Sequence, residues 1–102
     1  MAVKIPELDK GYIEDKLQQE GLIHLKVAKR GASISVYSED EDGGRDNRCR
    51  FTYVKTGQYI LNMANNSGKW ESTPFEGTLK ELLDMVLKQF PWMITDYSEE
   101  NN

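Results

Sequence analysis

Few residues in this chain have the types and spacing that catalysis requires. The chain contains one histidine, His24, and one cysteine, Cys49. No Gly-x-Ser-x-Gly or Cys-x-x-Cys pattern places a nucleophile beside that histidine, and the soft ligands are too few for a usual zinc or iron site. We expect His24 to be an exposed strand residue and Cys49 to be a small buried hydrophobe. The sequence therefore predicts a protein without enzymatic activity, cofactor or metal.

An acidic run offers a second kind of chemistry, the binding of a cation or of a partner. Segment 38–43 alternates oxygen-bearing side chains and ends in glycine, as does the first half of a calcium-binding loop. The twelfth position of such a loop needs a bidentate glutamate, and here it is Cys49. Because runs of like charge are usually solvated, we predict that 39–46 is a mobile surface loop. Its acids Asp40, Glu41 and Asp42 are candidate contacts for a partner.

A third pattern brings cations close to an aromatic ring. Lys26, Arg48 and Arg50 alternate with apolar residues in two segments that flank the segment of Tyr37 in the chain. If these segments are strands with one buried face, the four side chains share the opposite, open face. Such a face suits an acidic patch on a protein, or a single-stranded nucleic acid whose bases stack on the ring. The alternative is an ordinary solvated strand face, because long cationic side chains cover open sheets well.

The charge balance limits these options. The chain of 102 residues has 13 lysines and arginines against 17 acids, which gives a formal net charge of -4 at pH 7. Nucleic-acid binding normally leaves a clear basic excess, so this charge disfavours it. A single cysteine cannot form an internal disulfide, and residues 1–8 lack the apolar run of a secretion signal. We therefore expect a cytoplasmic protein that does not enter a membrane.

Two segments carry the signals of helices that would position these side chains. Asp9 can cap a first turn and Gly21 can end the helix, which predicts the first helix between these residues. A second helix should begin at Thr78, since Thr78 and Glu81 match a capping box. Apolar residues then recur at spacings of three and four until Pro91 ends the run.

Between the helices, apolar residues alternate with polar ones, as in half-buried strands. Turn-forming residues divide this region, among them Gly31, the pair Thr56-Gly57 and the cluster 65–68. Because connections this short join only antiparallel neighbours, the strands should form a meander. The five expected strands cover residues 22–29, 33–38, 48–54, 58–63 and 69–73.

The expected fold is α+β, a five-stranded antiparallel meander sheet with an N-terminal and a C-terminal helix packed on one face. A chain of this length buries one core, so residues 1–97 should form a single domain. Residues 98–102 are acids and asparagines after a serine, and we expect a disordered acidic tail. Segment 92–97 either closes over the core or forms an apolar patch for a partner.

The leading hypothesis is a non-enzymatic protein-interaction module of the inhibitor, immunity or adaptor type. It would bind a protein partner, or a second copy of itself, through the open face, an edge strand or the acidic loop. One alternative is single-stranded nucleic-acid binding on the basic face. Another is small-ligand binding between sheet and helices, with Tyr53, Tyr59 and Trp70 lining the pocket. The candidate interaction surface consists of Lys26, Tyr37, Arg48, Arg50, Asp40, Glu41 and Asp42.

Overall fold

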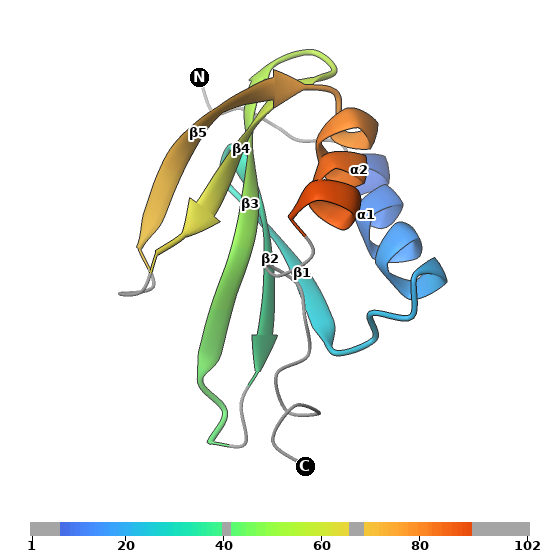
Figure 1. Ribbon diagram of the computed structural model, residues 1–102, viewed down its shortest axis with the longest axis vertical. Helices are drawn as coiled ribbons and strands as arrows, with labels where there is room; N and C mark the ends of the chain where they lie inside the picture. Colours follow the sequence, from blue (N-terminus) through green and yellow to red (C-terminus); the bar gives the residue numbers. More distant parts are fainter. Residues whose placement is uncertain (1–6, 40–41, 66–68, 91–102) are drawn as a thin grey trace.

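The chain folds into one five-stranded sheet with a helix before the strands and a helix after them (Figure 1). The structure is a computed structural model, and it describes residues 7–39, 42–65 and 69–90. The predicted α+β class is confirmed. Along the chain the elements are α1 (Glu7–Gln19), β1 (Leu25–Arg30), β2 (Ser33–Glu39), β3 (Arg45–Lys55), β4 (Gln58–Ala64), β5 (Trp70–Gly77) and α2 (Leu79–Gln89).

The strands follow one another across the sheet in chain order, and every neighbouring pair is antiparallel. This is the predicted meander, and two residues, Thr56-Gly57, connect β3 to β4. Gly57 has a φ of +75° there. A positive φ is costly for a residue with a side chain, so glycine permits this short connection.

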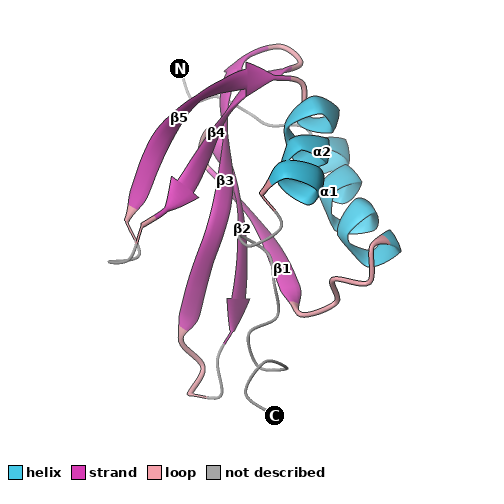
Figure 2. Ribbon diagram, viewed as in Figure 1, coloured by secondary structure: helices cyan, strands magenta, loops and turns pink. Residues whose placement is uncertain are grey.

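The hydrophobic core lies between the two helices and one face of the sheet (Figure 2). α1 contacts β1, α2 contacts β4 and β5, and the helices touch each other. Full burial of one such apolar side chain stabilises the fold by about 1.5 to 3 kcal/mol. The buried side chains of this cluster are Ile13, Leu17, Leu25, Ile34, Val36, Cys49, Phe51, Tyr59, Leu61, Leu79, Leu82, Leu83 and Val86.

α2 begins where the sequence predicts it. The Thr78 hydroxyl accepts a hydrogen bond from the Glu81 backbone N–H at 3.2 Å, and the Glu81 carboxylate accepts one from the Thr78 N–H at 3.0 Å. This reciprocal pair is the expected capping box. The backbone hydrogen bond from Thr78 lowers the pKa of the Glu81 carboxyl, because it favours the ionised form. The helix that follows buries its apolar stripe in the core.

α1 does not begin where the sequence predicts it. The helix starts at Glu7, so Asp9 lies inside it instead of capping it. The Asp9 carboxylate is used elsewhere, since its Oδ2 accepts a hydrogen bond from the Tyr59 hydroxyl at 2.5 Å. Burial, together with this carboxylate, raises the pKa of Tyr59, so the phenol remains a donor. The bond ties α1 to β4, which is distant from it in sequence.

Two strands start three residues away from the predicted positions. β1 starts at Leu25, and Ile23, which was expected to point into the core, is 83% exposed in the preceding turn. β3 already starts at Arg45, so the end of the expected acidic loop pairs with β2 instead. Alternation of apolar and polar residues can continue through a turn, and it does not by itself mark where a strand begins.

The edge strand β5 is longer than predicted because it continues through Pro74. The register of β4 and β5 shifts between Ile60 and Asn62, where three residues of β5 lie opposite Leu61. The Thr73 hydroxyl donates a hydrogen bond to the Leu61 carbonyl at 2.8 Å at this irregularity. Proline has no N–H to give to a ladder, and an edge strand with a bulge is where a sheet tolerates it.

Five predictions fall wholly or partly outside the described residues. They concern the acids Asp40 and Glu41, the turn cluster 65–68, the helix end at Pro91, the apolar segment 92–97 and the tail 98–102. Within the described ranges, neither helix has the length and hydropathy that crossing a bilayer would need.

The capping box gives a first prediction. Thr78→Ala removes the hydroxyl that accepts the Glu81 N–H, so the free energy of unfolding should fall by about 1 kcal/mol in urea denaturation. Lys80→Ala is the matched control, because Lys80 is exposed in the same turn and has no part in the box. An equal loss in both variants would show that the box does not stabilise the helix.

Candidate functional site

We call the sheet face that points away from the helices the open face. Strand alternation and the pairings place rows of side chains across it. Most of these side chains are polar, and no second layer of the described structure covers them (Figure 1). The first row contains Arg30, Ser33, Thr52, Ile60 and Glu76; the second contains Ala28, Ser35, Arg50, Asn62 and Ser72; the third contains Lys26, Tyr37 and Asn47; the fourth contains Glu39 and Arg45; and Ala64 and Trp70 pair on β4 and β5.

β3 contains one extra residue, Arg48. Val36 pairs with Cys49, but the next residue of β2, Tyr37, pairs with Asn47. A bulge of this kind takes the extra residue out of the regular alternation of faces. Arg48 points to the helix-covered face and is only 7% exposed. The prediction that Arg48 lies on the open face is therefore wrong.

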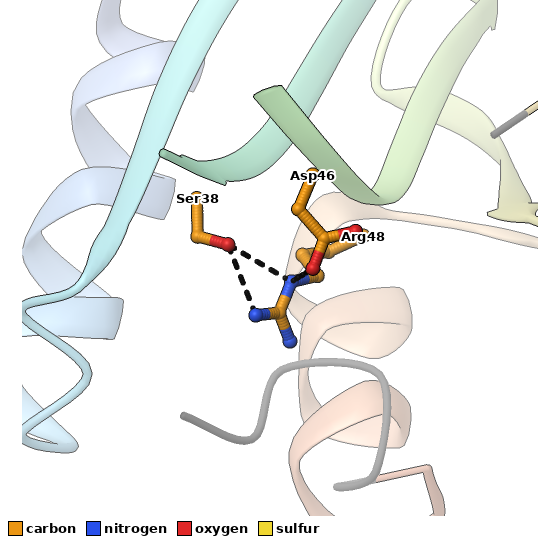
Figure 3. A network of polar contacts seen from close by, with 3 residues as sticks. All are labelled: Ser38, Asp46 and Arg48. Carbon is orange, nitrogen blue, oxygen red and sulfur yellow. Dashed lines mark hydrogen bonds and ion pairs between the residues drawn. The ribbon is translucent and has the colours of Figure 1, made fainter. Parts of the chain in front are cut away.

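The Arg48 side chain is held by polar groups at the edge of the core. Its Nε and Nη2 donate hydrogen bonds to Ser38 Oγ at 3.2 and 3.0 Å, and Nε lies 3.3 Å from Asp46 Oδ2. Figure 3 shows these three side chains converging. Ser38 is buried, whereas the Asp46 side chain is 57% exposed, so water screens the ion pair. The charge of Arg48 belongs to this network and not to the open face.

The charges of the two strands explain the bulge. In a regular register, Asp46 would lie opposite Glu39, and like charges directly opposite each other destabilise a strand pair. With the bulge at Arg48, Arg45 lies opposite Glu39 instead, and Asp46 lies beside Arg48. For this sequence, the bulged register therefore avoids a pair of like charges that an unbulged register would create.

Two arginines of the open face stack on aromatic rings. The guanidinium carbon of Arg45 lies 4.2 Å from the centre of the Tyr37 ring, and that of Arg50 lies 4.9 Å from the centre of the Trp70 ring. Stacking orients a guanidinium without neutralising its charge. Tyr37 does lie on the open face, but with Arg45 over its ring it is only 9% exposed. It is not a free platform for a base.

A buried amide holds Arg50 from below. Arg50 Nε donates a hydrogen bond to Asn62 Oδ1 at 3.2 Å, and the Thr52 hydroxyl donates to the same oxygen at 2.5 Å. Asn62 Nδ2 in turn donates to Ser72 Oγ at 3.4 Å. Asn62 is only 4% exposed although it lies on the open face. Burial lowers the pKa of Arg50, since no described carboxylate forms an ion pair with this guanidinium.

The arginines border a groove of about 380 Å³ on the open face. None of the described acidic residues lines it, and none forms an ion pair with Arg30, Arg45 or Arg50. The groove is therefore strongly cationic within a chain of net charge -4. Six of its lining residues are Arg30, Arg45, Arg50, Ser33, Ser35 and Trp70.

The other predicted contacts do not add to this charge. Lys26 lies on the open face but forms an ion pair with Glu39 of β2, and the hydrogen bond to that carboxylate raises the pKa of Lys26. Asp42 is exposed in the connection between β2 and β3. Of the five described residues among the seven predicted as an interaction surface, only Arg50 lines the groove.

Sequence analysis missed Arg30 and Arg45. Arg30 follows the last residue of the strand predicted at 22–29, and Arg45 was assigned to a loop. The available signal for Arg45 was the charge of the facing strand, because with Arg45 in β3 the residue opposite Glu39 is a cation and not Asp46.

Two other pockets are not lined by clusters of like charge. One of about 580 Å³ lies between α1 and β1, and its only acid, Glu14, is paired with Lys10. Another of about 330 Å³ contains the Asp9 and Tyr59 pair together with Lys80.

The candidate enzymatic groups are not arranged for catalysis. Cys49 is buried, and burial raises the pKa of its thiol to about 12. His24 lies in the turn before β1, half-buried, and not in a strand as predicted. Trp70 lies on the open face, so it cannot line a pocket with Tyr59 between sheet and helices. Among the described side chains, no group of three acids, cysteines or histidines could hold a metal ion.

Comparison with protein-family models, curated proteins and solved structures found no significant match to this chain. The function of the groove is therefore argued from its geometry and charge.

The burial of Cys49 gives a second prediction. Its pKa is about 12 in the folded chain against 9.0 for an unperturbed thiol, so unfolding releases a proton once the pH exceeds 9. The contribution of the protonated Cys49 thiol to the free energy of unfolding is complete below pH 9. It declines by about 1.4 kcal/mol per pH unit between pH 9 and the pKa of the folded state. The measurement is the free energy of unfolding from pH 8 to 11. Cys49→Val should have a shallower decline, and equal slopes would contradict the account.

The Arg48 network gives a third prediction. Ser38→Ala deprives a buried guanidinium of the oxygen that accepts two of its hydrogen bonds, so the free energy of unfolding should fall by about 1 to 3 kcal/mol. Ser35→Ala is the control, because Ser35 lies on the same strand but on the open face. It should change stability by less than about 0.5 kcal/mol. A reversed order of the two losses in urea denaturation would rule out a stabilising role for the network.

Proposed function

We propose that the protein is a non-enzymatic protein-interaction module that binds an acidic surface of a partner through the open face of its sheet. The observation that carries the proposal is the gathering of Arg30, Arg45 and Arg50 around one groove without an ion pair to any described carboxylate. Cations without counter-ions on one face, in a chain that is acidic overall, favour a partner that supplies the opposite charge.

The way in which two of these arginines are held also supports binding. Arg45 stacks on Tyr37, while Arg50 stacks on Trp70 and is bonded to Asn62. Side chains that are already oriented lose less conformational entropy when a partner binds. Arginine is enriched at protein interfaces, where its planar group forms paired hydrogen bonds with carboxylates.

The same contacts argue against single-stranded nucleic acid. Modules that bind unpaired bases present exposed aromatic rings for stacking. On this face Arg45 covers Tyr37 and Arg50 lies over Trp70. The net charge of -4 adds a repulsion toward a polyphosphate chain.

A capture experiment with charge-reversed variants tests the proposal. Immobilised wild-type protein should retain a protein partner from nuclease-treated lysate of the source cells, and the retention should weaken as salt rises. Arg30→Glu combined with Arg45→Glu should abolish retention, because the groove then carries two negative charges. The matched control reverses two exposed lysines of α2, Lys80→Glu with Lys88→Glu, and it should retain the partner.

Two results would overturn the proposal. The first is capture that survives reversal of the groove charges in a variant shown by circular dichroism to be folded. The second is capture that depends on RNA or DNA, with no protein retained after nuclease treatment.

A further inference from the structure

The groove on the open face has more positive charge than one carboxylate can neutralise. Three guanidinium groups, those of Arg30, Arg45 and Arg50, line a single space of about 380 Å³. A carboxylate carries one negative charge and two acceptor oxygens. A phosphate monoester carries a charge of about -1.5 to -2 at pH 7 and three acceptor oxygens. The charge in this space therefore matches a phosphate better than it matches a carboxylate.

The donors around the groove also suit a phosphate. Each guanidinium is a planar fork that can give two parallel N–H bonds to phosphate oxygens. The hydroxyls of Ser33 and Ser35 lie on the same floor, and hydroxyls are common donors to phosphate. The Thr52 hydroxyl donates its proton to Asn62, so Ser33 is the donor in the 3.5 Å hydrogen bond between Ser33 and Thr52. This long bond is the one that Ser33 would exchange for a bond to a phosphate.

Arg50 is oriented before any ligand arrives. Its Nε is bonded to Asn62 and its guanidinium lies over Trp70, so the bonds of its Nη groups are left for a ligand. Burial lowers the pKa of Arg50, and none of the described carboxylates forms an ion pair with its guanidinium. A dianion in the groove would pair with this charge.

The exposure of the aromatic rings on the open face distinguishes a nucleic-acid phosphate from a phosphorylated side chain. A nucleic-acid phosphate is a diester with one charge, and its affinity for a sheet face usually depends on bases stacked on open rings. Tyr37 is 9% exposed beneath Arg45, so the face offers a phosphate site without that stacking. A phosphorylated side chain of a protein needs arginines and no stacking platform.

We infer that the groove of Arg30, Arg45 and Arg50 is a binding site for a phosphorylated side chain of the partner protein. The inference rests on the function proposed above and adds the chemical group that the open face recognises. Phosphorylation of the partner then controls the association, because the unmodified hydroxyl lacks the charge that the three arginines require.

The test uses three degenerate peptide libraries that differ only at the central position, which is phosphoserine, glutamate or serine. Binding is followed by fluorescence of Trp70 in a Trp92→Phe background, since Trp70 lies against Arg50 in the groove. The phosphoserine library should bind at least about tenfold more tightly than the glutamate library. Its affinity should fall from pH 7.5 to pH 5 as the phosphate takes up a proton near its second pKa of about 6.

A conservative variant separates recognition of phosphate from attraction between charges. Replacing all three arginines by lysine keeps the charge but removes the forks, so the phosphoserine preference should fall by about tenfold or more. Lys80→Ala, outside the groove, is the control and should bind like the wild type.

The failures of the two proposals can be told apart. Equal binding of the phosphoserine and glutamate libraries overturns the inference, and so does a phosphoserine preference that survives the lysine replacement. Either result leaves the proposed function intact if the captured partner is still lost on charge reversal. Tighter binding of short single-stranded RNA than of any peptide overturns both.

Discussion

Both helices cover the same face of the sheet, and this one-sided burial is the constraint on which the rest of the structure depends (Figure 2). Because the apolar side chains of the strands lie on the covered face, the alternate residues must be stable in water. Burial of apolar side chains therefore does not fix the positions of the side chains on this face. The face needs hydrogen bonds and stacking between the side chains themselves, and those contacts determine where its charges lie.

The open face meets that need around Asn62, which is nearly as buried as a core residue although it lies on the side without helices. Its amide joins Arg50, Thr52 and Ser72 across three strands. The same contacts that satisfy a buried amide also orient the guanidinium of Arg50. Stability of the sheet and preparation of a binding surface therefore rest on one set of hydrogen bonds.

How much of this could be predicted from the sequence depends on the range of the interactions involved. The capping box at Thr78 and the turn at Gly57 are local, so the residues alone locate them. The short turns likewise predict the meander, and the alternation within each strand predicts its buried face. The partner of Asp9 is a tyrosine 50 residues away, and no local pattern could reveal it. The face of Arg48 depends on how two strands align, which alternation within one strand does not determine. The conflict between Glu39 and Asp46 was the available signal, and it could have been found only by comparing the charges of paired strands.

In genetic terms, Arg48 is equivalent to one extra codon in a strand that would otherwise pair regularly with β2. With that codon absent, Tyr37 would still face Asn47 and Glu39 would still face Arg45, because the shift in register lies at the inserted residue. β3 thus aligns with β2 in two separate registers, one from Arg45 to Asn47 and the other from Cys49 to Thr52. Loss of this one codon would therefore keep both alignments and would remove only the guanidinium that Ser38 and Asp46 hold.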